Sequence, residues 1–166
     1  MDSKATDQFL EFFYKEYSES LFSPLLQVDA IEPSLQEDGT SCLVLEPHSV
    51  ALLEQLCILL GFIVTYHAMF SKNFYLSHEG ILKSVTLLLK AKETHLKLAA
   101  LRVLRISLGT KDEFYRRLLI KLDVFGPIFR TLLDTGGRYN VLNSACLEFF
   151  DFIRKVWFRL IVDARR

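Results

Sequence analysis

Apolar residues along this chain recur three and four positions apart, which is the spacing of the buried face of a helix. The pattern holds from residue 9 to 17 and, after an acidic interruption, from residue 47 to 153. Period-two alternation is absent and β-branched clusters, which are typical of strands, are few. The sequence therefore predicts an all-α protein. Helices are expected at about 6–17, 24–28, 47–64, 70–75, 77–89, 94–108, 111–122, 124–133 and 140–153.

Residues that begin and end helices support this division. Asn140 suits an N-terminal cap of the last helix. Ser23-Pro24 would cap the second helix and occupy its first turn. Gly109 suits a helix C-terminus, and Gly136-Gly137 is the clearest break in the chain.

Two stretches of the sequence match each other. Lys72–Leu89 aligns with Arg116–Leu133 at a constant offset of 44, and one inserted residue then changes the offset to 45 and pairs Ala100 with Ala145. Each unit has a short, a medium and a long helix, within the ~40–47 residues of armadillo and HEAT repeats. Coincidence between two amphipathic helices would not explain why the turns and three helix lengths also agree. We therefore predict an armadillo/HEAT-like helical-repeat solenoid.

The prediction divides the chain into four parts. They are N-terminal helices of the repeat array at 1–28, an exposed acidic loop at 29–46, armadillo-like repeats at 47–155 with units at about 67–110 and 111–155, and a divergent C-terminal end at 156–166.

Apolar residues on the repeated helices form the predicted core. The final helix reaches Trp157 and Phe158 with no further unit to cover them. We therefore expect both side chains to be exposed and the isolated chain to self-associate or to be poorly soluble. The core residues predicted are Leu88, Leu89, Leu101, Leu104, Leu132, Ala145, Phe149 and Ile153.

The charge of the chain is balanced overall but segregated along it. A formal net charge of zero gives no general reason to expect nucleic acid or an anionic membrane as a partner. Residues 1–60 carry two Lys and eleven Asp or Glu, whereas residues 61–166 carry eighteen Lys or Arg and nine acids. The two halves could simply have solvated helix faces of different sign, or the basic half could meet an acidic partner.

Hydropathy and cysteine content indicate the kind of compartment. The longest apolar stretch, Val50–Val64, contains Glu54 and is shorter than the ~20 residues that a membrane span needs, so we expect a buried helix and no membrane partner. No secretory signal is visible. The three cysteines are odd in number and far apart, which favours a reducing compartment.

The sequence has no recognisable catalytic or metal-binding motif. Its four histidines have no partners at metal-ligand spacing. It also lacks a glycine-rich phosphate loop and the strand-turn-helix elbow that presents a nucleophilic serine. We therefore expect a protein that is not an enzyme and that needs no cofactor.

Two polar clusters interrupt the apolar background and supply a candidate partner surface. The acids of the first, at 111–116, suit a helix N-terminus, and the second lies at 138–145. Both could equally be structural, because helix junctions must satisfy exposed backbone groups. With two arginines of the preceding helix, the candidate surface comprises Arg102, Arg105, Asp112, Glu113, Tyr115, Arg116, Arg117, Arg138, Tyr139 and Asn140.

The same clusters resemble the conserved central domain of the suppressor-of-MEK (SMEK) family, which is regulatory subunit 3 of protein phosphatase 4. The similarity extends more weakly back to 12–15 and 23–26. The runs that carry it are Lys111-Asp112-Glu113-Phe114-Tyr115, Leu132-Leu133-Asp134, Arg138-Tyr139-Asn140, Leu142-Asn143-Ser144-Ala145 and Phe152-Ile153-Arg154.

The resemblance implies a non-catalytic scaffold that helps target the phosphatase to its substrates in nucleus and cytoplasm. Links to DNA-damage response, signalling and cell-cycle control are implied as well. The implied partners are the protein phosphatase 4 catalytic subunit and its second regulatory subunit. These 166 residues are expected to lack the family's peptide-reading domain of the pleckstrin/EVH1 type and its acidic tail, and to depart from the family pattern after Arg154.

The sequence also allows a second function, in which the basic half is a receptor for an acidic peptide or for nucleic acid. Clustering of its cations on one concave face would favour that function, and dispersal would disfavour it. The cations concerned are Lys97, Arg102, Arg105, Arg116 and Arg117.

Overall fold

The computed structural model describes residues 3–163 apart from 32, 36–40, 79 and 111, and of residues 3–5, 35 and 157–163 it describes the backbone only. The predicted all-α class is confirmed. The α-helices are α1 (Ser3–Glu16), α2 (Ser18–Leu26), α3 (Pro47–Tyr66), α4 (Ala68–Ser77), α5 (Gly80–Leu87), α6 (Thr94–Gly109), α7 (Glu113–Lys121), α8 (Phe125–Asp134) and α9 (Val141–Asp163). Short 3₁₀ turns, Gln27–Ala30 and Leu88–Lys90, extend α2 and α5.

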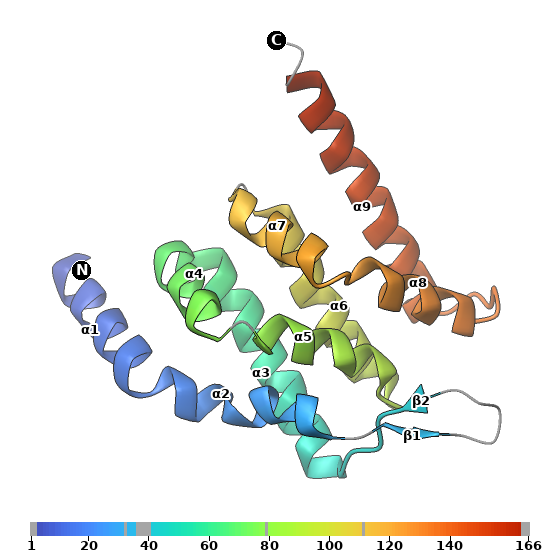
Figure 1. The fold of residues 1–166 in the computed structure, drawn as a ribbon, viewed down its shortest axis with the longest axis horizontal. Coiled ribbons are helices and arrows are strands. Elements are labelled where there is room, and N and C mark those ends of the chain that lie inside the picture. The colour runs from blue at the N-terminus through green and yellow to red at the C-terminus, as the bar shows by residue number, and fades with distance from the viewer. Residues whose placement is uncertain (1–2, 32, 36–40, 79, 111, 164–166) are drawn as a thin grey trace.

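The helices stack as three units of three, α1-α2-α3, α4-α5-α6 and α7-α8-α9 (Figure 1). Helices at the same position in successive units pack together: α3 lies against α6, α6 against α9, α2 against α5 and α1 against α4. This is the helical-repeat arrangement expected of a solenoid, in which each unit contacts its neighbours. The internal sequence match involves the second and third units. The first unit was found only in the structure. The segment at 29–46 separates its second helix from its third, so it lacks the even spacing of the other two units.

Pro24 lies inside α2 and does not begin a helix, so the prediction of a new start at Ser23-Pro24 is wrong. A proline in this position cannot donate a backbone hydrogen bond to the carbonyl of Ser20, four residues earlier. The hydroxyl of Ser23 donates to that carbonyl instead, at 3.0 Å. The chain therefore keeps its helical path through the proline.

The segment at 29–46 was predicted as an exposed loop, but its described residues include two short strands and a buried side chain; residues 32 and 36–40 lie outside the described part. Two short antiparallel strands, β1 (Ser34–Leu35) and β2 (Ser41–Cys42), pair in it, so the expectation of a strand-free chain is corrected. Leu43 is buried, and its amide donates to the carbonyl of Lys90 at 2.8 Å. Apolar burial and a backbone hydrogen bond thus attach the end of this segment to the second unit.

The turns differ in how well the sequence predicted them. Asn140 caps α9, since its Oδ1 accepts from the amide of Asn143 at 2.8 Å. Gly136 and Gly137 have positive φ of 60° and 69°, as a sharp break requires. Gly109 does end α6, but it is not in the left-handed conformation of a C-terminal glycine cap.

The predicted core is largely correct. Leu88, Leu89, Leu101, Leu104 and Phe149 are buried, whereas Leu132, Ala145 and Ile153 are only partly buried and pack against the core from its edge. These three lie in the last described unit, which no further described helix covers. The side chains of Trp157 and Phe158, predicted to be exposed, lie outside the described residues.

Among the described helices, only α3 is long and apolar enough to cross a membrane, by length and composition alone. Its apolar character has another explanation in this fold, because α3 packs against α2, α4 and α6. Leu53, Leu60 and Val64 are among its buried side chains. This agrees with the buried helix that the sequence predicted.

Candidate partner-binding groove

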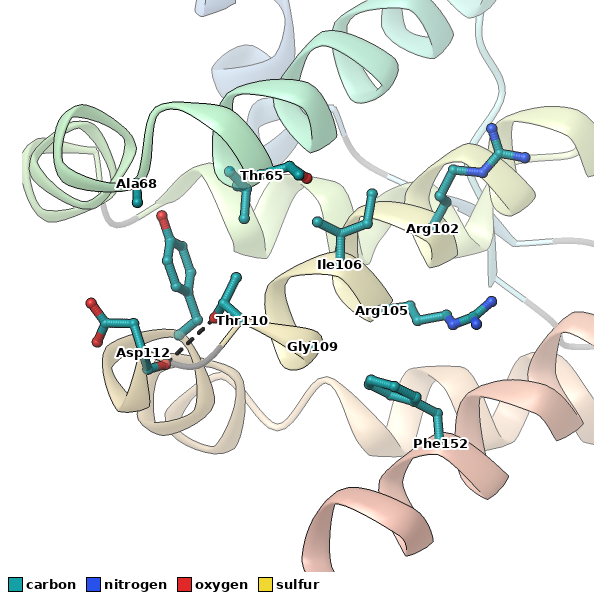
Figure 2. Close-up of a pocket in the computed structure, with 11 residues that line it drawn as sticks. Thr65, Ala68, Arg102, Arg105, Ile106, Gly109, Thr110, Asp112 and Phe152 are labelled. Carbon is teal, nitrogen blue, oxygen red and sulfur yellow. Dashed lines mark hydrogen bonds between the residues drawn. The ribbon is translucent and has the colours of Figure 1, made fainter. Parts of the chain in front are cut away.

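The third helices of the three units, α3, α6 and α9, border a groove centred on α6. Its larger part is a cavity of about 680 Å³ (Figure 2). Thr65 of α3 and Ile106 of α6 line it, and Phe152 of α9 closes it on the far side. The segment between α6 and α7 supplies Thr110 and Asp112. The groove therefore draws on all three units of the stack.

A smaller cavity of about 180 Å³ lies between α3 and α6 and shares Thr65, Arg102 and Ile106 with the larger one. Phe62 and Tyr66 of α3 stand at its wall, with ring centroids 4.6 Å apart. Phe62 is 50% exposed and Tyr66 is 70% exposed, which is unusual for aromatic residues that gain so much from burial. The two cavities thus adjoin at these three shared residues, and we call them together, with the exposed aromatic wall, the α6 groove.

Two glycines allow the third helices to approach one another beside this groove. A Cβ atom at Gly61 would lie 3.0 Å from the Cδ1 of Ile106, and one at Gly109 would lie 3.2 Å from the Cζ of Phe152. The first contact joins α3 to α6 and the second joins α6 to α9. Neither of these close contacts was predicted from the sequence.

Two arginines of α6 lie in the groove in different electrostatic states. The guanidinium of Arg105 bonds the carboxylate of Glu148 on α9 at 2.7 Å and lies 5.6 Å from the centroid of the Phe152 ring. Arg102 is exposed and lines both cavities, and no hydrogen bond or ion pair joins it to any residue in the described part of the chain. Figure 2 shows both side chains extending from α6 to one side of the cavity, away from Asp112.

Asp112 lies at the opposite side of the larger cavity, where its carboxylate has partners. It accepts from the amide of Phe114 at 2.8 Å, which caps α7, and from the ammonium group of Lys72 at 3.0 Å. The backbone bond to Phe114 and the bond to Lys72 lower the pKa of Asp112 below its ordinary value of 3.8. Asp112 is therefore an ionised helix cap that already has a cation as its partner.

Tyr115 was predicted as part of a partner surface, but the structure places it in the core. It is buried, and its hydroxyl lies 2.8 Å from that of Ser71. Burial raises the pKa of Tyr115, while the bond to Ser71 lowers it. Its neutral ring also packs edge-on against Tyr75, with centroids 5.3 Å apart. Tyr115 supports the floor of the groove and is not a docking residue.

The other predicted surface residues lie away from the groove. Glu113, Arg116 and Arg117 line a separate cavity of about 170 Å³ against α8 and α9, and Glu113 pairs with Arg117 at 3.2 Å. Arg138 and Tyr139 are exposed in the turn between α8 and α9. The structure thus brings together Arg102, Arg105, Asp112 and Tyr115, and it separates the remaining six.

The described cations that the sequence singled out in the basic half do not gather on one face. Only Arg102 and Arg105 share the α6 groove, and Arg105 is already paired. Arg117 pairs within α7, on a different surface. Dispersal of this kind disfavours a phosphate backbone as the ligand, because nucleic-acid binding depends on several unpaired cations in a row.

The aromatic wall of the α6 groove was not predicted from the sequence. Phe62 and Tyr66 are four residues apart on a face of α3 that differs from its buried residues Val50, Leu53 and Leu60. That second apolar face is a signal that the sequence contains. Within the described residues, no group of three or more His, Cys, Asp or Glu is arranged to hold a metal ion.

Comparisons with known proteins point to one family. The sequence profile described as Phosphatase 4 regulatory subunit 3 matches residues 1–164, and so also covers most of the end that we had set apart as divergent. No solved structure matches this chain significantly.

Two curated relatives give the same answer. The chain is 35% identical over 147 residues to mouse Protein PPP4R3C1, which is 89% of this chain and 18% of that protein. It is 36% identical over 146 residues to Serine/threonine-protein phosphatase 4 regulatory subunit 3 of Drosophila melanogaster, which is 88% of this chain and 14% of that protein. The chain thus spans less than a fifth of the length of either relative. The resemblance found in the sequence is confirmed, and this chain belongs to the phosphatase 4 regulatory subunit 3 family.

Proposed function

We propose that this chain is a non-catalytic scaffold within a protein phosphatase 4 complex, where it holds partner proteins and helps direct the phosphatase to substrates. Family membership supports a regulatory role. The observation that carries the scaffold role is the α6 groove, which three stacked units build. It contains exposed aromatic side chains beside Arg102, which has no partner among the residues that the structure describes. Grooves of this kind hold segments of other proteins.

The partners we propose are the phosphatase 4 catalytic subunit and its second regulatory subunit. A relative's name includes serine/threonine-protein phosphatase 4, and names it as regulatory subunit 3. In this proposal the chain supplies rigid surfaces, and the chemistry of phosphate hydrolysis stays with the catalytic subunit. Binding energy then increases the local concentration of substrate near the phosphatase without any new catalytic group.

Co-elution of purified proteins tests the scaffold role. The chain is mixed with purified phosphatase 4 catalytic subunit, with and without the second regulatory subunit, and the mixture is separated by size-exclusion chromatography. We expect a complex that contains the chain, and no hydrolysis of p-nitrophenyl phosphate by the chain alone. Independent elution from both subunits, or hydrolysis that persists in a catalytic-subunit-free preparation, would overturn the proposal.

We also propose that the chain acts in both nucleus and cytoplasm, with a role in the DNA-damage response. The support for this is family membership. Imaging of a fluorescently tagged chain before and after DNA damage is the test. Confinement to a membrane-bound organelle other than the nucleus would contradict it.

A further inference from the structure

We propose that the α6 groove binds a short extended segment of a partner protein in which one carboxylate side chain is flanked, two residues away on each side, by bulky apolar side chains. This inference rests on the proposed scaffold function and specifies the chemistry of the segment that the scaffold holds. Three features of the groove carry it, namely its charge, its apolar walls and its direction.

Charge determines the central residue of the ligand. Arg105 forms an ion pair with Glu148, and Asp112 forms one with Lys72. Arg102 lies one helical turn before Arg105 on α6, exposed and without a partner among the described residues. A guanidinium group offers a planar pair of donors that matches a carboxylate, and this pairing is strong when the surroundings are apolar. Arg102 is therefore the position at which this groove offers a donor pair to a carboxylate of a ligand.

The apolar walls determine the flanking residues. On one side of Arg102 lies the smaller cavity, with Phe62 and Ile58 of α3. On the other side lies the larger cavity, which Phe152 of α9 closes. Ile58 and Phe62 are about half exposed, and a side chain that covered them would remove apolar surface from water. An apolar residue on each side of the carboxylate satisfies both walls.

The course of the groove determines the spacing. The smaller cavity is lined by residues within 57–66 of α3 and 99–106 of α6, and the larger one by residues within 64–65 of α3 and 102–109 of α6, so the groove follows both helices toward their C-terminal ends. Arg102 lines both cavities. In an extended segment laid along this course every second side chain points the same way, and residues i, i+2 and i+4 extend over ~13 Å with the middle one placed at Arg102. The expected pattern is apolar-x-acidic-x-apolar.

Fluorescence anisotropy with a defined probe tests the inference. The probe is a fluorescein-labelled peptide, Gly-Ser-Phe-Thr-Glu-Thr-Leu-Ser-Gly, and its control carries Gln in place of Glu. We expect saturable binding of the probe and about tenfold weaker binding of the control, as the loss of one charge-assisted pair implies. Arg102→Gln should weaken binding of the probe by a similar factor, and the affinities for probe and control should then be equal.

A charge exchange separates pairing from general disruption. Arg102→Glu should reject the probe but bind a peptide in which Lys replaces Glu. Phe62→Ala should weaken binding of both peptides and leave the ratio of their affinities unchanged, since it removes an apolar contact only. Arg138→Gln, an exposed arginine outside the groove, is the matched control and should bind as the parent does. Circular dichroism of each variant verifies that the helices are intact.

Other occupants of the groove give different results. Binding of an oligothymidylate, or of vesicles containing phosphatidylserine, that depends on Arg102 while the peptide does not bind would overturn the proposal. So would a dimer in sedimentation that Phe62→Ala dissociates, since a second copy would then fill the groove. Peptide affinity that is unchanged by Arg102→Gln would overturn the proposal as well.

The outcome is distinguishable from failure of the scaffold role. If the chain elutes with the phosphatase catalytic subunit but does not bind the peptide, the scaffold function stands and this inference is wrong. If the peptide binds with the expected dependence on Arg102 and no phosphatase subunit co-elutes, the groove binds the proposed kind of segment and the proposed scaffold function is wrong.

Discussion

The hydroxyl oxygens of Ser71 and Tyr115 lie 2.8 Å apart in the interior, and the two residues are 44 positions apart in the sequence. That separation equals the offset at which the second and third units align, so the two residues occupy the same position on α4 and α7. Equivalent positions meet because successive units are stacked like helix on like helix. The bond therefore marks the joint between two units.

Removing the Tyr115 hydroxyl should weaken this joint. Tyr115→Phe keeps the ring, and the Ser71 hydroxyl still has the carbonyl of Ala68 at 3.1 Å. We expect a loss of about 0.5–1.5 kcal/mol in the free energy of unfolding, measured with urea. Tyr139→Phe makes the same change at a fully exposed ring and should leave stability unaltered. Equal effects of the two substitutions would mean that the buried bond contributes nothing.

Truncation of Leu104 tests the core of α6. The side chain is fully buried, so Leu104→Ala should cost ~2–5 kcal/mol through lost burial and the cavity that remains. Leu147→Ala, at a position 54% exposed on α9, is the control and should cost much less. Thermal unfolding of Leu104→Ala that matches the parent within error would show that this helix is not packed as described.

Enlarging Gly61 tests the close approach of α3 and α6. A Cβ atom there would lie 3.0 Å from the Cδ1 of Ile106, so Gly61→Val must displace that side chain and should cost ~1–3 kcal/mol. Gly80 has nothing within 4 Å of its added Cβ, and Gly80→Val should be close to neutral. If urea midpoints show the two valines equally tolerated, the two helices are not in close contact at this point.

The cap at Asp112 should make stability depend on acid pH. Its pKa is lowered in the folded state, so its contribution is fully present above its ordinary value of 3.8 and is lost as pH falls through the lowered pKa. Asp112→Ala should cost ~0.5–2 kcal/mol at neutral pH, as loss of an N-cap does. The gap between parent and variant should close at pH values below 3.8.

The acid titration has a matched control in Asp7→Ala, which removes an exposed carboxylate of α1. Its unfolding free energy should follow that of the parent across the same pH range. A gap for Asp112→Ala that stays constant down to strong acid would show that ionisation of this carboxylate does not stabilise the cap.

Thiol labelling should distinguish the three cysteines. Burial, with a smaller effect of Glu54, raises the pKa of Cys57 to about 12, and burial also raises the pKa of Cys146. Cys42 is partly exposed beside the short strand pair. We expect one thiol to react quickly with Ellman's reagent in the native protein and all three to react in urea. Cys42→Ser should remove the fast phase, and its survival would contradict this assignment.

The sequence by itself determined the helices, the second and third units of the repeat, the break at Gly136-Gly137 and the cap at Asn140. These features depend on residues close together in the chain: helical periodicity, backbone conformations that glycine adopts readily, and a side chain that reaches an amide three residues on. The family was also accessible, because its polar clusters are contiguous in the sequence.

Tertiary structure alone decided the first unit, the burial of Leu43 and the composition of the groove. Arg102 and Arg105 lie three residues apart on one helix, and the sequence treats them alike. Glu148 of α9 pairs with Arg105, whereas Arg102 has no ion-pair partner within the described part of the chain. Whether a charge is paired, a glycine is crowded or an aromatic ring is covered depends on which distant helix lies beside it, and that information is non-local.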